Sequence, residues 1–184
     1  MNPDSADISG ARFVSSPNCD ERPVDVEISL LVLHNISLPP GQYGGGWIED
    51  LFLNRLEPQA DPYFATICGL KVSTHLLIYR DGEVVQFVPL SQRAWHAGES
   101  TFLGCNGCND FSIGVELEGC DEQPYTEQQY QSLVQVTREI QERYPAIIPA
   151  HIVGHSDIAP QRKTDPGPAF EWARYRKMLA DKKR

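Results

Sequence analysis

Residues 151–168 read HIVGHSDIAPQRKTDPGP, and the rest of the chain can be interpreted around them. Residues 151–153 are typical of a short buried strand, which Gly154 interrupts. A loop rich in Asp, Pro and Gly follows and ends at Pro168, where a helical pattern begins. Such loops present reactive groups on rigid folds. This one carries an imidazole, an ammonium and a carboxylate: His155, Lys163 and Asp165. A stiff loop could bring the imidazole and the carboxylate together around a metal.

Composition and charge indicate one soluble domain with a substantial core. The chain has 184 residues, 41% of them apolar, and a formal net charge of −9. An acidic chain without a basic run before its last residues predicts neither nucleic acid nor an anionic membrane as a partner. No segment reaches the roughly 20 apolar residues that span a bilayer. No long exposed apolar stripe is evident, which favours a monomer.

The N-terminus and the cysteines predict a cytoplasmic protein. Residues 1–7 show neither the basic nor the apolar region of a secretory signal. An odd number of cysteines favours reduced thiols; they are Cys19, Cys68, Cys105, Cys108 and Cys120. The Cys105-x-x-Cys108 spacing also resembles half of a zinc knuckle or a redox pair, but a structural zinc would need two more ligands.

Hydrophobic patterns and turn signals predict an α/β fold, a single domain over residues 1–184 with a central mixed β-sheet and helices packed on it. Strands are expected at residues 28–33, 74–79, 84–88, 111–117 and 147–153. The second and third form a hairpin around Asp81-Gly82. Helices are expected at residues 47–53, at 126–144 with a Thr126/Gln129 capping box, and from Pro168 onward. Residues 1–27 are expected to wrap the surface.

Polar groups occupy three predicted strand ends: His34, Glu116 and His155. If neighbouring strands align these ends, the groups converge at one edge of the sheet. Imidazoles with one carboxylate form a common catalytic zinc set. A second carboxylate could then act as a general base, and Lys163 could balance negative charge on a substrate oxygen. A histidine at a strand end is more often structural, however, and spacing alone leaves both interpretations open.

Other polar positions favour structural roles. His75 lies inside an apolar strand and is expected to be a hydrogen-bonded core histidine. His151 stands at a strand start and is expected to be structural or to support the ligands from behind. Residues 44–46 (Gly-Gly-Gly) lack the context of a phosphate-binding loop and could form a mobile lid.

Several segments together resemble the zinc N-acetylmuramoyl-L-alanine amidases. They are LLVLHNIS (30–37), STHLLIYRDGEVVQFV (73–88), AWHAG (94–98), SIGVELEG (112–119) and VGHSDIAPQRKTDPGPAF (153–170). The resemblance runs from about Arg12 to the final helix. Within the superfamily it is closest to the cytoplasmic 1,6-anhydro-N-acetylmuramyl-L-alanine amidases of Gram-negative cell-wall recycling.

This resemblance implies a role for each matching residue. The ligands of one zinc ion per chain would be His34, His155 and Asp165. Glu116 would activate the attacking water, and Lys163 would stabilise the tetrahedral oxyanion. Four positions would contact the substrate, the second of them as a cation for peptide carboxylates: Asn35, Lys71, Trp95 and His96.

The implied reaction is hydrolysis of the amide bond between the lactyl group of (1,6-anhydro)-N-acetylmuramic acid and L-alanine of the stem peptide. The substrate would be a small anhydromuropeptide. One alternative is a peptidoglycan-recognition module, because some proteins of this fold have lost the metal and only bind. Another is the same chemistry on intact cell wall, and a third is a thiol or metal sensor built on the cysteines. The complete ligand set favours catalysis, and the N-terminal sequence favours recycling.

Overall fold

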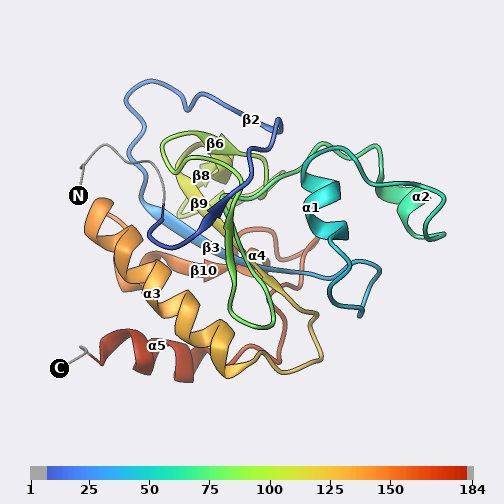
Figure 1. The fold of residues 1–184 in the computed structure, drawn as a ribbon. Helices are drawn as coiled ribbons and strands as arrows, with labels where there is room; N and C mark the ends of the chain where they lie inside the picture. Colours follow the sequence, from blue (N-terminus) through green and yellow to red (C-terminus); the bar gives the residue numbers. More distant parts are fainter. Residues whose placement is uncertain (1–7, 182–184) are drawn as a thin grey trace.

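A six-stranded mixed sheet forms the centre of the protein (Figure 1), whose computed structural model describes residues 8–181. The strand order is β1-β5-β4-β9-β3-β10. The bounds are β1 Arg12–Phe13, β3 Leu30–Ile36, β4 Leu76–Ile78, β5 Val84–Gln86, β9 Ser112–Glu118 and β10 Ile152–Gly154. β4 and β5 pair antiparallel, and the other neighbours are parallel. The predicted α/β class with a mixed sheet is confirmed.

Helices cover both faces of this sheet (Figure 1). One face packs against α3 (Glu127–Arg143) and α5 (Trp172–Ala180), and the other against α1 (Trp47–Phe52) and α2 (Phe64–Ile67). The short α4 (His155–Ile158) follows β10 directly. The remaining elements are β2 Cys19–Asp20 paired with β6 Arg93–Ala94, β7 Thr101–Phe102 paired with β8 Cys105–Asn106, and the 3₁₀ turns η1 Cys108–Asp110 and η2 Pro149–His151. No helix among residues 8–181 has both the length and the apolar character needed to cross a bilayer.

The two long central strands, β3 and β9, place polar side chains on the same face of the sheet. Along a strand, alternate side chains point to opposite faces. Leu31 and Leu33 of β3 pack in the core beneath α3, so His34 points to the opposite face. In β9, Val115 likewise packs in this core. The parallel register pairs His34 with Glu116, and the two polar side chains therefore share one face of the sheet.

Local signals account for the elements that the sequence predicts well. In α3 the Gln129 amide N–H donates to Thr126 Oγ1, and the Thr126 amide N–H donates to Gln129 Oε1, both at 3.1 Å. This reciprocal cap satisfies two backbone donors at the helix start. The β4–β5 hairpin closes around Asp81-Gly82, where Gly82 has a φ of 89°, a value that glycine adopts readily.

Several boundaries differ from the sequence prediction. The strand predicted to end at residue 33 continues through His34 to Ile36, because β9 pairs with it along its full length. The strand predicted at 147–153 starts with the η2 turn and shortens to β10. The predicted loop after Gly154 begins with α4, and the last helix starts four residues beyond Pro168, at Trp172, after a turn in which the Phe170 amide donates to Gly167 O.

The N-terminal segment does more than wrap the surface. Its residues 1–7 lie outside the described residues, but residues 12–13 form β1 and extend the sheet beyond β5. Further along, Asn18 is buried and its side-chain amide donates to Val72 O at 2.8 Å. A two-residue strand has no periodicity that a sequence pattern could reveal.

Candidate functional site

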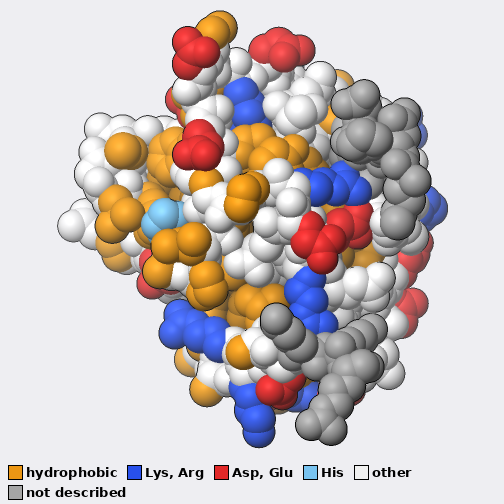
Figure 2. All heavy atoms as spheres, turned by 90° about the vertical axis from the view of Figure 1, so that its left-hand side faces the viewer, with side chains coloured by type: hydrophobic (Ala, Val, Ile, Leu, Met, Phe, Trp, Pro, Cys, Tyr) orange, Lys and Arg blue, Asp and Glu red, His pale blue; other side chains and the backbone are white. Residues whose placement is uncertain are grey.

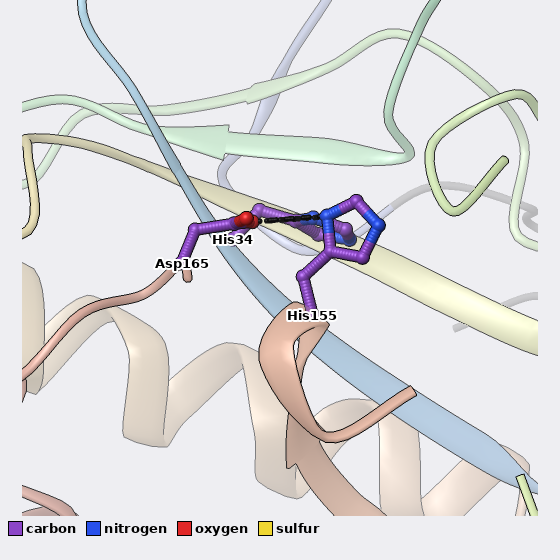
Figure 3. A group of neighbouring side chains, drawn as sticks. All are labelled: His34, His155 and Asp165. Carbon is purple, nitrogen blue, oxygen red and sulfur yellow. Dashed lines mark hydrogen bonds and ion pairs between the residues drawn. The ribbon is translucent and has the colours of Figure 1, made fainter. Parts of the chain in front are cut away.

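Three side chains from different parts of the chain converge on one face of the sheet (Figure 3). His34 comes from β3, His155 is the first residue of α4, and Asp165 lies in the loop that follows. His34 Nδ1 lies 2.9 Å from His155 Nδ1 and 3.0 Å from Asp165 Oδ2, and His155 Nδ1 lies 3.1 Å from the same oxygen. All three side chains are buried. The ligand set predicted from the sequence is thus brought together in space.

The chemistry of this cluster fits a metal ion. The three donor atoms lie within 4.8 Å of one another. Burial lowers the pKa of His34 to about 4, so this imidazole is neutral at pH 7. Burial would raise the pKa of Asp165, but hydrogen bonds from His155 and His34 outweigh it and hold that pKa below its usual range. Neutral imidazole and ionised carboxylate are the forms that bind metals, so the site is prepared for a cation.

Glu116 stands next to His34 on the neighbouring strand β9. The residue is half-buried, and its Oε2 atom is buried without a hydrogen-bond partner among the described residues. Burial and the negative charge of Asp165 raise the pKa of Glu116 well above its ordinary value, against the opposing effect of Lys163. A carboxyl with a raised pKa accepts a proton more readily than an ordinary glutamate, as a general base must.

A cavity of about 630 Å³ opens above these groups. Its polar floor includes five of the residues discussed: Asn35, Glu116, His155, Lys163 and Asp165. Its walls are largely apolar and come from the chain around α1 and α2: Leu38, Leu51, Phe52, Tyr63, Ile67, Leu70 and Val72. An apolar cavity with a few convergent polar groups is typical of small-molecule sites.

A different face, shown in Figure 2, has acidic and basic side chains interspersed without an extended area of one sign.

The predicted substrate-contacting residues divide into two groups. Asn35, Trp95 and His96 line the cavity. Asn35 Nδ2 also donates to Asp121 Oδ1 at 2.8 Å and to Pro166 O at 3.1 Å, so it tethers the loop that carries Asp165. Lys71 is exposed and does not belong to the cavity lining.

Two histidines outside the cluster are structural. His75 Nδ1 accepts from the Gly114 amide at 3.0 Å, and its Nε2 donates to Gln92 O at 3.0 Å, which confirms the predicted core role. His151 Nδ1 lies 3.0 Å from both Ser29 O and Ala146 O, so it too has local backbone partners.

The cysteines form no second centre. All five are free thiols, with Cys105 exposed and Cys108 buried. Within residues 8–181, the only cluster of three or more potential metal-ligating side chains is the one formed by His34, His155 and Asp165. A structural zinc held by Cys105 and Cys108 therefore has no further ligands in the described part of the chain.

The apolar wall and the acidic rim of the cavity were not predicted from the sequence. Tyr63 and Leu70 are 40% and 50% exposed in the wall, and Asp121 and Glu122 contribute to the rim. Exposed apolar residues in an irregular segment have no periodicity, so no sequence signal separates them from ordinary surface residues. Asp121 could have been suspected only from its position shortly after β9.

The fold and the site define an α/β protein with a candidate metal centre at the floor of a cavity of substrate size. The sequence model of the N-acetylmuramoyl-L-alanine amidase family matches residues 25–168. The 1,6-anhydro-N-acetylmuramyl-L-alanine amidase AmpD of Enterobacter cloacae is 59% identical over 169 residues, which are 92% of this chain and 90% of that protein. The chain therefore belongs to the N-acetylmuramoyl-L-alanine amidase family, and the amidase class predicted from its sequence is confirmed.

Two solved structures extend this comparison. The crystal structure of a selenomethionine AmpD derivative is 56% identical with a TM-score of 0.93, covering 97% of this chain and 99% of that one. The Escherichia coli N-acetylmuramyl-L-alanine amidase AmiD, solved with the substrate anhydro-N-acetylmuramic acid-L-Ala-D-γ-Glu-L-Lys, is 31% identical with a TM-score of 0.62. That match covers 85% of this chain and 60% of AmiD.

Proposed function

We propose that the protein hydrolyses the amide bond between the lactyl group of 1,6-anhydro-N-acetylmuramic acid and L-alanine of the stem peptide, with one zinc ion per chain. The observation that carries this proposal is the convergence of His34, His155 and Asp165 beside Glu116, beneath one cavity. The names of the similar AmpD proteins and the substrate bound to AmiD support the choice of an anhydromuropeptide.

The three converging side chains would hold the zinc ion. Two imidazoles and one carboxylate are a ligand set that catalytic zinc sites use, with a position left open. When bound, zinc supplies a Lewis acid that polarises the scissile carbonyl and increases the acidity of water.

Glu116 and Lys163 would perform the proton and charge chemistry. Because its pKa is raised, the Glu116 carboxylate can take the proton of the attacking water and return it to the departing nitrogen of L-alanine. Lys163 lines the same cavity, and its ammonium can stabilise the negative charge that develops on the carbonyl oxygen. The products are anhydromuramic acid, or a sugar that contains it, and the free stem peptide.

The cavity suits a substrate with an apolar face and several polar groups. Its volume of about 630 Å³ lies in the range of small-molecule sites, roughly 300–1,000 Å³. Asn35, Trp95 and His96 would contact the substrate near the floor, and Lys71 would attract peptide carboxylates from outside. The proposal includes a monomer that acts in the cytoplasm; the five free thiols fit a reducing compartment.

The decisive experiment combines metal content with turnover. The protein is purified without chelator, zinc is counted per chain, and release of the peptide from anhydro-N-acetylmuramic acid-L-Ala-D-γ-Glu-L-Lys is followed. We expect one zinc per chain and release that a chelator abolishes. Asp165→Ala should lose both turnover and tight zinc binding. Asp157→Asn is a matched control, because Asp157 Oδ2 only accepts from the Gly154 amide and the asparagine can still do so.

Other outcomes would identify the alternatives. Zinc binding with release of peptide only from intact cell wall would replace the recycling substrate by the polymer. Muropeptide binding without zinc and without turnover would mean a recognition module. Near-normal activity of Asp165→Ala would remove this residue from the metal site.

A further inference from the structure

We propose that the backbone segment His96–Ala97, clamped by Asn109, fixes the tautomer and the orientation of both histidine ligands. This inference rests on the proposed zinc site. It assigns to His96 a second task besides lining the cavity, and it gives Asn109, which the sequence did not single out, a positioning role.

The first arm of this arrangement supports His34. Its Nε2 lies 2.9 Å from His96 Nδ1, and His96 Nε2 lies 3.1 Å from Ser112 Oγ. A neutral imidazole has one N–H and one acceptor nitrogen. When His34 donates from Nε2, His96 accepts at Nδ1 and donates from Nε2 to the hydroxyl of Ser112. His34 Nδ1 then presents its lone pair to the cluster.

The second arm supports His155, with a stricter constraint. Its Nε2 lies 3.0 Å from the carbonyl oxygen of Ala97. A carbonyl can only accept, so when a metal takes the place of the Nδ1 hydrogen that otherwise faces Asp165 Oδ2, His155 carries its hydrogen on Nε2 and donates it to Ala97 O. Arg162 also donates to Ala97 O and to Glu99 O, and so holds this carbonyl from the other side.

The side chain of Asn109 holds both His96 and Ala97 in place. Asn109 Oδ1 accepts from the backbone N–H of His96 at 3.1 Å and from that of Ala97 at 2.8 Å. On the sheet side, the ring of His96 lies over Gly114 of β9, where a Cβ would come within 2.5 Å of His96 Cγ. The segment is therefore held between the side chain of Asn109 and the backbone of β9 at Gly114. Any side chain at residue 114 would displace it.

The energetic expectation follows from how ligating histidines behave. Partners that hydrogen-bond the outer nitrogen of a metal-bound imidazole typically contribute 10- to 100-fold in metal affinity. Here two adjacent residues supply both partners, so loss of the clamp should affect both ligands at once.

The test measures zinc dissociation constants by competition with a chromophoric chelator, without substrate. His96→Phe keeps a flat ring over Gly114 but removes the acceptor, and should weaken zinc binding by about 10- to 100-fold. Asn109→Leu should weaken it similarly, and Asn109→Asp should restore it, because a carboxylate oxygen still accepts from both N–H groups. The matched control is His151→Phe, which removes a histidine whose hydrogen-bond partners are backbone carbonyls elsewhere and should leave zinc affinity unchanged.

Long-range ¹H–¹⁵N NMR of the histidine rings provides the readout that a purely structural role would not move. In the zinc-loaded wild type, the Nε2 hydrogens of His34 and His155 should both show the downfield shift and slow solvent exchange of hydrogen-bonded imidazole N–H groups, and the His34 signal should lose both features in His96→Phe. Wild-type zinc affinity in folded His96→Phe and Asn109→Leu would overturn the inference, as would an Nδ1–H tautomer of His155 in metal-free Asp165→Ala. The His155 tautomer is also read in metal-free Asp165→Ala, where no carboxylate competes for the Nδ1 hydrogen, and it still decides the inference if the wild type binds no zinc, a result that would instead contradict the proposed function.

Discussion

Glu116 and Glu118 lie two residues apart on β9 but have different surroundings. Glu116 faces the cavity, and Glu118 binds the backbone of two other segments. Glu116 and Glu118 point to the same face of the sheet, because side chains alternate along a strand. Glu118 is buried, and its two carboxylate oxygens accept from backbone amides, Oε1 from Gly44 at 2.6 Å and Oε2 from Arg80 at 3.1 Å. Glu116 faces the cavity with Oε2 unpartnered among the described residues.

Hydrogen-bond partners, and not residue type, therefore separate the catalytic candidate from the structural residue. A carboxylate that meets two N–H groups is satisfied as an anion and holds its neighbours in place. A carboxylate without such donors has a raised pKa and remains available to a substrate or a water molecule. Four substitutions test this difference between the two glutamates and their surroundings.

The largest effect is expected for Glu116→Gln. The amide cannot take a proton from water, so turnover should fall by roughly 100- to 10,000-fold, the span expected for loss of a general base. Zinc content should stay at the wild-type level, because Glu116 is not one of the three converging donors. The measurement is the initial rate of peptide release together with zinc counted per chain. Loss of zinc in this variant would make Glu116 a ligand and end the contrast with Glu118.

The next effect concerns the two lysines that the sequence associated with the site. Lys163→Met removes the ammonium that lines the cavity, and kcat should fall by about 100- to 1,000-fold if this cation stabilises the developing oxyanion. Lys71→Met is the matched comparison, because Lys71 is exposed outside the cavity lining. It should raise KM for peptides with free carboxylates and leave kcat unchanged. Equal losses of kcat in both variants would contradict a special role for Lys163.

The sequence alone predicted the elements with strong local signals. The helix beginning at Glu127 carries its own cap and apolar face, and the hairpin has its Asp81-Gly82 turn. The apolar runs that became β3 and β9 were also found. The short elements were not: β1 and α4 owe their conformation to a partner strand and to a capping aspartate, which periodicity does not record.

For the site, the residue types were predictable and the register was not. Motif resemblance identified His34, His155 and Asp165, and the structure brings their donor atoms together. That Glu116 stands beside His34 depends on strand pairing between distant segments, which spacing cannot reveal. Asn109 acts through two backbone N–H groups, and such contacts leave no pattern in the sequence around it.

A smaller effect, on stability instead of rate, is expected for Glu118→Gln. One carboxylate oxygen becomes an NH₂ group that faces a backbone N–H, of either Gly44 or Arg80, and leaves that donor without an acceptor. A buried unsatisfied donor costs about 1–3 kcal/mol. The free energy of unfolding, measured by urea denaturation, should fall by this amount, and the rate of peptide release should change only a few-fold. A rate loss as large as that of Glu116→Gln would erase the distinction between the two glutamates.

The smallest effect is a pH dependence of stability that comes from Glu116. The pKa of Glu116 is raised in the folded protein, so between about pH 4.3, the usual glutamate value, and the folded pKa the native state binds more protons than the unfolded state. The stability contributed by this residue therefore decreases as pH rises. In metal-free protein, Glu116→Gln should be more stable than the wild type at about pH 7, and this difference should shrink toward pH 4. Glu118→Gln should be the less stable protein at pH 7. Urea denaturation of chelator-treated proteins across this range tests both signs, and a pH-independent difference for Glu116→Gln would show that its carboxyl ionises in the folded state as it does in the unfolded chain.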